Sequence, residues 1–407
     1  MAKEFSNMQR LTIGKVFREE LGLMLRDKKL IIILLITPIL YSVLFGFLYS
    51  HERITEIPVV VYDGDNSQLS RQIIQAFDAT DTFAVTKQSW NQDDIVQQVE
   101  EGQFKVGLII PNDFSASLKH GENVPILTVI DGSNLMYSNS ASRIANQVIS
   151  SVSAGASMKA LEQKGMNSDQ ANSVFSTIPF RSRVLYNPVY NYKLFMPIGV
   201  ISTALQQCLL LGIALSCTRD KEQGTWSRFY QWRHTPWRLA IAKLTPYFLA
   251  GMVNVLTVFS IAAFAFHIPF KGQLLPFILL AIAFNLALCG LGFLFSLFSR
   301  TKVDATQTLM LIAVPSFMLS GYTWPLEAMP TFLQMVAKAL PLTYYLDAVR
   351  AITLKGQGMV AIVPDLLSLC LIGLISLLIA LIAYPLAFKK REQEEEQAIE
   401  VDRTVVE

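Results

Sequence analysis

Charged residues are scarce in this sequence. They make up 16% of its 407 residues, whereas a soluble globular protein usually carries about a quarter. The scarcity is uneven, because several long runs have almost no charge while the rest of the chain is near normal. This mosaic excludes an ordinary soluble protein and indicates a membrane protein with a soluble insert. A net charge of +2 without a basic tail gives no reason to expect a nucleic-acid partner.

Cysteine and the familiar catalytic motifs are also scarce or absent. The four cysteines all lie inside apolar runs, without the spacing of a metal site or a disulfide framework. No phosphate-binding loop of the G-x-x-x-x-G-K-[ST] type occurs, and no histidine accompanies a recognisable nucleophile. Asp63-Gly64-Asp65 opens like a calcium loop, but Gln68 and Ile74 replace the glycine and glutamate that such a loop needs. We therefore expect no catalytic or metal site, and no cofactor bound by the chain itself.

Long hydrophobic runs are what the sequence has instead. A helix that crosses roughly 30 Å of hydrocarbon needs about 20 apolar residues. Six runs meet this length: 30–50, 194–218, 244–270, 272–299, 305–326 and 366–388. Among Lys, Arg, His, Asp and Glu, only His267 occurs within them. The sequence therefore predicts a polytopic α-helical membrane protein with six transmembrane helices.

Lys and Arg are distributed unevenly over the segments that connect these runs. With the N-terminus placed in the cytoplasm, nineteen of them fall in inside segments and only four in short outside loops. Short cytoplasmic loops of membrane proteins carry an excess of Lys and Arg. We therefore expect both termini in the cytoplasm and residues 51–193 outside the membrane.

The outside segment alternates strand and helix patterns. The pattern predicts strands at 57–63, 83–87, 105–110 and 125–130, with helices at 68–78 and 92–101. This alternation predicts an α/β domain inserted between the first and second spans. Long helices rich in Ser, Ala, Asn and Gln come next over 134–176, broken near Gly165. Their weakly apolar faces lack the lining of a small-molecule site, so we expect them to contact a second protomer or an adaptor.

The two ends of the chain have patterns of their own. Residues 8–28 place apolar side chains between Arg and Lys, which predicts an amphipathic helix at the cytoplasmic surface, either a mere anchor or a mechanical element. The charged tail is predicted to be solvated, with disorder as an open alternative. The predicted parts are a cytoplasmic amphipathic helix (1–29), the first span (30–50), the outer domain (51–193), a five-helix membrane domain (194–388) and the tail (389–407).

The cytoplasmic segment 219–243 is longer than a simple turn. It carries three tryptophans among basic residues, which suits a short helix at the membrane interface. Gly224 would allow a tight change of direction, Thr225 would cap the short helix after it, and Pro236 would end that helix before the next span. Composition alone favours a docking site and an interfacial loop without a partner about equally.

The same segment resembles the E-x-G-T…T/S-P signature of ABC-2-type permeases, through Lys221-Glu222-Gln223-Gly224-Thr225 and Thr235-Pro236. The resemblance extends along most of the chain, in an order that fits six spans. It includes Tyr186-Asn187-Pro188, Leu319-Ser320-Gly321-Tyr322 with Pro325, Met329 and Pro330, and Pro341-Leu342-Thr343-Tyr344. Val129-Ile130-Asp131-Gly132-Ser133-Asn134 resembles the subgroup with a large domain after the first helix.

This resemblance implies a permease subunit of an ABC exporter in a bacterial cytoplasmic (inner) membrane, without an ATPase site of its own. The implied partners are an ABC ATPase dimer, which hydrolyses the ATP, and a second permease copy, identical or related; a periplasmic membrane-fusion adaptor is a further candidate. A re-entrant segment is implied at 324–345. The residues implied in ATPase coupling are Arg219, Glu222, Gln223, Gly224, Thr225 and Pro236. One departure is Trp232-Arg233-His234, where the family more usually has small or aliphatic residues.

Polar residues within the spans are candidates for a translocation path, because burying them in lipid is costly. Interhelical hydrogen bonds are the alternative role for each. No acid or base lies deep in the spans, which argues against an ion-driven carrier and suits a hydrophobic or amphipathic substrate. The candidates are Gln206, Gln207, Asn254, Asn285 and Gln307.

Two functions from different classes remain open. One is an ATP-driven exporter permease, and the other is a membrane receptor or scaffold whose outer domain binds a ligand or a protein. The segment 219–243 discriminates between them, because a passive receptor needs no ATPase-docking element.

Overall fold

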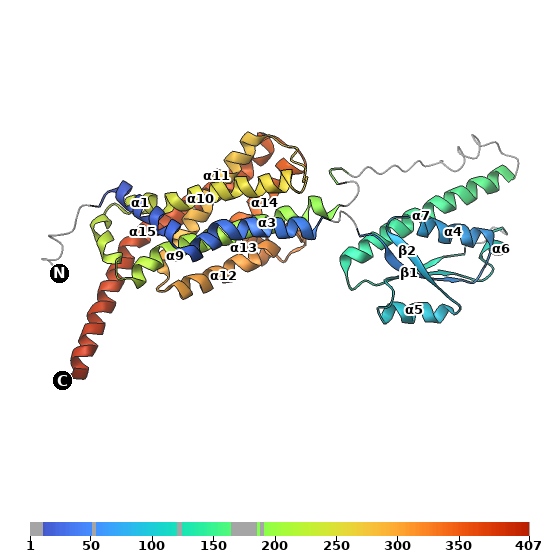
Figure 1. Cartoon of the computed structure of the whole chain (residues 1–407), viewed down its shortest axis with the longest axis horizontal. Helices are drawn as coiled ribbons and strands as arrows, with labels where there is room; N and C mark the ends of the chain where they lie inside the picture. The colour runs from blue at the N-terminus through green and yellow to red at the C-terminus, as the bar shows by residue number, and fades with distance from the viewer. Residues whose placement is uncertain (1–10, 51–53, 120–123, 164–184, 188–190, 407) are drawn as a thin grey trace. The chain divides into compact units, whose positions relative to one another are not determined.

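The computed structural model describes residues 11–50, 54–119, 124–163, 185–187 and 191–406. The chain forms two compact units, one made of residues 1–50 and 191–407 and the other of residues 51–190 (Figure 1). Each unit has its own hydrophobic core, so each is described by itself.

The smaller unit is an α/β domain. Its elements are β1 (Ile57–Asp63), α4 (Gln68–Asp78), β2 (Phe83–Ser89), α5 (Gln92–Glu100), β3 (Val106–Ile110), α6 (Phe114–Lys119), β4 (Leu127–Ile130) and α7 (Leu135–Gln163). All four strands overlap the ranges predicted from the sequence. Of the helices predicted over 134–176, the structure describes α7 as far as Gln163, and the predicted break near Gly165 lies outside the described residues.

The strand order of this sheet is β2-β1-β3-β4, with β1 parallel to both neighbours and β4 antiparallel to β3. Alternate side chains of β1 point to opposite faces. Val59 and Val61 join a core with α4 and α7, whereas Val60 packs with Ile95 of α5. Helices therefore cover both faces of the sheet, α4 and α7 on one and α5 on the other (Figure 1).

The larger unit is helical. Its elements are α1 (Ile13–Arg26), α2 (Lys28–Ile31), η2 (Ile32–Ile36), α3 (Thr37–Leu48), η3 (Tyr192–Leu194), α9 (Met196–Glu222), η4 (Trp226–Trp232), α10 (Pro236–Phe264), α11 (Leu274–Phe298), α12 (Lys302–Leu319), η5 (Leu326–Ala328), α13 (Thr331–Ala339), α14 (Pro341–Thr353) and α15 (Met359–Val406). Here η2 is a turn of π-helix and the other η elements are 3₁₀-helices.

Among the described residues of this unit, five helical stretches are long and apolar enough to cross a membrane: Lys28–Leu48, Tyr192–Glu222, Pro236–Phe264, Leu274–Phe298 and Met359–Leu386. The remaining predicted span corresponds to α12, whose 18 residues begin with a charged and polar stretch. The protein is thus a membrane protein of several apolar helices, and the count of six stays a prediction. The segment predicted to be re-entrant contains η5, α13 and the start of α14, with Pro341 as the first residue of α14.

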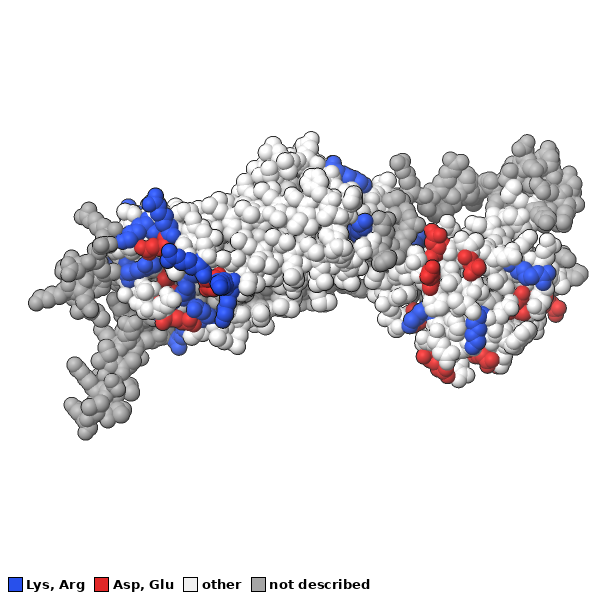
Figure 2. Space-filling view, viewed as in Figure 1, with Lys and Arg blue, Asp and Glu red and all other residues white. Residues whose placement is uncertain are grey.

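Charge is confined to the ends of the helical unit. Lys and Arg gather at one end, and the long middle is almost free of charged atoms on the face shown in Figure 2. This is the distribution that a membrane-spanning bundle requires. The charged tail does not form a disordered segment, because α15 continues as a helix to Val406.

Candidate functional site

The segment 219–243 makes a sharp turn and then a short helix. After α9 ends, Gly224 adopts φ +69°, a left-handed conformation that other residues rarely take. The tight change of direction predicted at this glycine is therefore confirmed. The next helix, η4, is a 3₁₀-helix, and Thr235 precedes the start of α10 at Pro236. The predicted capping role of Thr225 is wrong: its hydroxyl donates to Asp220 instead of accepting from η4.

The two residues before the turn attach it to the neighbouring helices α11 and α12. The ammonium of Lys221 donates to three backbone carbonyls at the end of α11, at 2.6–2.9 Å, where a cation is favoured by the helix dipole. The carboxylate of Glu222 accepts from the backbone N–H of Lys302 at 2.7 Å and lies 3.2 Å from its ammonium. Glu222, the glutamate of the E-x-G-T motif, therefore caps the start of α12.

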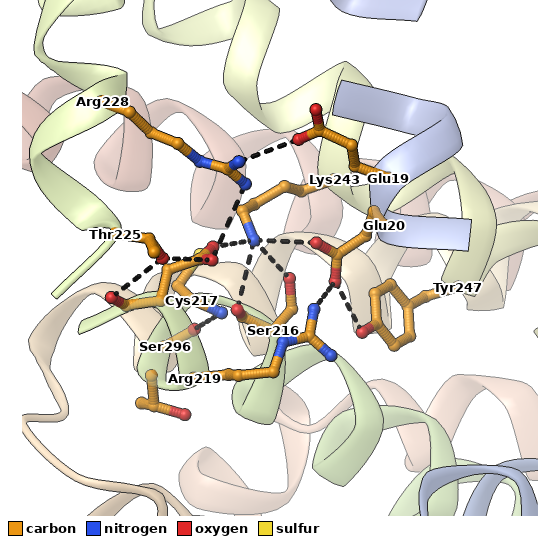
Figure 3. A network of polar contacts seen from close by, with 12 residues as sticks. Glu19, Glu20, Ser216, Cys217, Arg219, Thr225, Arg228, Lys243, Tyr247 and Ser296 are labelled. Atoms are coloured by element: carbon orange, nitrogen blue, oxygen red, sulfur yellow. Dashed lines mark hydrogen bonds and ion pairs between the residues drawn. The ribbon is translucent and has the colours of Figure 1, made fainter. Parts of the chain in front are cut away.

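A network of buried charges lies behind the turn (Figure 3). It consists of Glu20 from α1, Arg219 and Asp220 from α9, and Lys243 from α10, all at most 6% exposed. Glu20 lies 2.6 Å from Arg219 and 3.0 Å from Lys243, and Lys243 also pairs with Asp220. Two acids and two bases cancel in charge. Such a group tolerates burial only when every member is paired.

Neutral side chains and a second ion pair surround this network. The Tyr247 hydroxyl donates to Glu20 at 2.8 Å, and Lys243 donates to the hydroxyl of Ser216. At the rim, Arg228 of η4 pairs with Glu19 of α1 at 2.8 Å. The helix α1 is therefore joined by ion pairs to η4, α9 and α10 together.

The pKa of Glu20 reflects these partners. Burial on its own would raise the pKa of the carboxyl group. The positive charges of Lys243 and Arg219 outweigh that effect and hold the pKa below its ordinary value. Glu20 is thus an anion at neutral pH.

The tryptophans of the segment do not all lie at a surface. Trp226 and Trp232 are 2% and 3% exposed and pack around Phe229, whose carbonyl accepts from the Tyr384 hydroxyl of α15 at 3.0 Å. Only Trp237 is exposed as the interfacial prediction required. The aromatic residues of η4 therefore pack into the core of the helical unit.

The structure separates the six predicted coupling residues. Glu222, Gln223, Gly224 and Thr225 form an exposed row at the turn, which can meet another protein. Arg219 is buried in the charge network and Pro236 is half-buried at the start of α10. Arg219 can therefore act only by holding the exposed row in place, whereas Pro236 is partly accessible.

The five polar residues of the spans also separate by environment. The Gln206 amide donates to Ser316 of α12, Asn254 donates to the carbonyl of Leu34 in the π-turn, and Asn285 donates to Ala281; all three are buried. Gln207 is half-buried and contacts α12, while Gln307 is exposed. Hydrogen bonds within the bundle therefore account for the first three, and Gln207 and Gln307 stay candidates for the path.

Sequence reasoning missed Glu20, Asp220, Lys243 and Tyr247. A signal for Glu20 was present, because it lies four residues from both Val16 and Met24 on the buried face of α1. An acid on the apolar face of an amphipathic helix needs a buried base. Lys243, seven residues into a largely apolar helix, was the matching signal.

Comparison with known proteins identifies relatives over most of the chain. The model of the family described as ABC-2 family transporter protein matches residues 28–382. The probable multidrug ABC transporter permease YbhR of Escherichia coli is 27% identical over 84% of this chain and 90% of its own length. The probable multidrug ABC transporter permease YbhS of E. coli is 24% identical over 69% of this chain and 72% of its own length. The inner membrane transport permease YhhJ of E. coli is 23% identical over 80% of this chain and 84% of its own length.

Proposed function

Because the chain belongs to the ABC-2 family of transporter proteins, we propose that it exports a hydrophobic or amphipathic compound across the cytoplasmic membrane. It is a membrane permease subunit and not an enzyme, since ABC-2 permeases work with a separate ATPase subunit. In this proposal an ATPase dimer supplies the energy and the permease itself binds no cofactor. A second copy, identical or related, completes the transporter, and both termini lie in the cytoplasm.

The observation that carries the proposal is the support beneath the exposed row Glu222–Thr225. The row is held by Lys221 on α11, by Glu222 on α12 and by the buried charge network on α1 and α10. A force applied at the row would therefore reach four helices at once. A surface loop without a partner has no need of such support.

The proposed substrate class rests on the lack of charge deep in the spans and agrees with the relatives, two of which are named as probable multidrug permeases. A hydrophobic or amphipathic compound can enter the bundle without a buried counter-charge. The outer domain is proposed to lie on the outer face of the membrane, where an adaptor protein is a further candidate partner.

The substitution Gln223→Trp tests ATPase docking. Gln223 is exposed at the turn, so a bulky side chain there blocks a partner without removing a described contact. Loss of one hot-spot contact weakens an interface about tenfold or more. We expect the variant to insert normally but to lose ATPase co-purification and transport.

Gln273→Trp is the matched control. Gln273 is also exposed but precedes α11, in the loop between α10 and α11. It should retain the ATPase. Equal ATPase binding and transport in both variants would contradict docking at 222–225 and would favour the receptor or scaffold function.

A further inference from the structure

The outer domain contains an apolar pocket of about 380 Å³. It lies between α4, α6 and α7. Leu69 and Ile73 of α4 form one wall, and Phe114 and Leu118 of α6 form another. Ile73 and Phe114 also belong to the core of the domain, at 2% and 5% exposure, so the hollow reaches the core.

The helix α7 supplies the third wall. Its first half buries Ala141 and Ala145 against the sheet, and its second half turns Ile149 and Val152 toward the pocket. The expectation that the long helices lack an apolar lining is therefore wrong. The weak overall amphipathicity of α7 hid an apolar stripe that packs on the core of the domain and, in its second half, also lines the pocket.

The position of the pocket in the sheet is also informative. The chain moves from β1 to β2 on one side and returns through α5 to β3 on the other, so the strand order reverses between β1 and β3. Open α/β sheets commonly bind ligands beside such a reversal, at the carboxyl ends of the strands. The pocket is lined by α4 and α6, the helices that come after those two strands.

The lining defines the chemistry of the occupant. None of the residues that line the pocket within the described chain is ionisable, and the only side-chain polar groups are the hydroxyls of Ser153 and Ser157, one turn apart on α7. A charged group would lose its hydration there without gaining a counter-charge. The volume falls in the range of small-molecule sites, which are typically apolar with a few polar groups.

We propose that this pocket binds the uncharged apolar part of a transported amphiphile, with Ser153 and Ser157 contacting its polar neighbour. The proposal rests on the export function above, since that function supplies the hydrophobic or amphipathic compound. The pocket would hold the compound outside the bundle and reduce its return to the membrane.

Protection of an introduced thiol tests this site in the full-length protein. In a Cys370→Ser background, Ser153→Cys places a thiol at the pocket, and Ser151→Cys places one on the same helix outside the lining, both at exposed positions. A membrane-impermeant maleimide is applied to each variant in nanodiscs, with and without N-phenyl-1-naphthylamine, an uncharged apolar dye. The dye should slow alkylation severalfold in Ser153→Cys and leave the rate in Ser151→Cys unchanged.

Two further arms make the result specific. A naphthalene sulfonate, similar in size but anionic, should protect much less. Adding Ala156→Trp, which fills the pocket, should abolish protection by the dye, whereas Ala154→Trp, outside the lining, should preserve it. If Ala156→Trp disturbs the fold, Ala156→Leu replaces it.

Equal protection at both thiols, or none at either, would overturn the proposal, as would full protection after the pocket is filled. The assay needs neither ATP nor transport. Failure of the pocket proposal is thus distinguishable from failure of the proposed export function, which the Gln223→Trp experiment tests separately.

Discussion

Glu20 accepts hydrogen bonds from three side chains on two other helices, Arg219, Lys243 and Tyr247. Removing one partner of a buried ion pair typically costs about 3–5 kcal/mol, because the remaining charge is left without compensation. Glu20→Gln keeps the shape but removes the negative charge. We expect it to lower the thermal stability of the purified permease and to reduce transport per ATP hydrolysed.

Glu19→Gln provides the control for this prediction. Glu19 is the neighbouring acid, but its side chain is 33% exposed and pairs with Arg228 at the rim. Such a pair is worth up to about 1 kcal/mol. Equal effects of Glu19→Gln and Glu20→Gln would show that the buried network has no special role.

The lowered pKa of Glu20 also gives the stability a pH dependence. A carboxyl group whose pKa is lower in the folded state stabilises the protein above its unfolded pKa, about 4.3, and loses that contribution as pH falls. The difference in melting temperature between wild type and Glu20→Gln should therefore be largest near neutral pH. It should shrink as the pH falls below about 4. A difference that stays constant over this range would contradict the assignment.

The parts of the site that sequence could predict are those set by local chemistry. Gly224 was predicted at a tight turn because few other residues adopt a positive φ. Thr225 was misassigned, because its hydroxyl had a competing acceptor in Asp220 that becomes available only after the turn forms. The contact between Glu20 and Lys243 joins residues 223 positions apart, and no local pattern encodes such a pairing.

At the scale of elements, the predictions held where one periodicity dominates. The strands of the outer domain are short runs of β-branched residues ended by turn residues, and the helix α4 is capped by Ser67, whose side chain accepts from the backbone N–H of Ser70. The packing of α7 was not predictable in this way, because its apolar stripe packs on the core of the domain and, in its second half, also lines the pocket. For the charged tail the sequence left disorder open as an alternative, and the structure has a helix there, because α15 continues through it.

Close packing of α11 and α15 yields a prediction at this scale. A Cβ atom on Gly373 of α15 would lie 3.0 Å from the Cα atom of Ala287 on α11, and backbone cannot yield as a flexible side chain can. Overpacking of this kind typically costs about 1–3 kcal/mol. We expect Gly373→Leu to lower the melting temperature of the permease, measured by scanning fluorimetry in detergent.

Gly358→Leu is the control for this helix pair. Nothing lies within 4 Å of a Cβ atom at Gly358, just before α15 begins. Its melting temperature should change little. If Gly373→Leu were as stable as wild type, the two helices would have to be farther apart than the structure places them.

At the scale of the whole molecule, the same chain combines a bundle with charge at its ends and a domain with an ordinary charged surface (Figure 2). The surface of the bundle is suited to contact with lipid, and the surface of the outer domain is suited to contact with water. An insert of about 140 residues is far longer than a connection between two helices requires. The side of the membrane on which this domain lies therefore determines what it can meet.

The charge asymmetry of the loops predicts that side. Nineteen Lys and Arg residues in the predicted inside segments against four in the outside loops should hold the end with η4 in the cytoplasm. In a Cys370→Ser background, which removes the one exposed native cysteine, a membrane-impermeant maleimide applied to intact cells should label Ser89→Cys or Ser138→Cys in the outer domain. It should spare Ser227→Cys on η4. Ser227 is exposed, so its thiol should react once the membrane is permeabilised, which separates sidedness from burial. Labelling of Ser227→Cys in intact cells, with protection of the other two, would invert the topology and place the proposed ATPase-docking row on the side of the membrane without ATP.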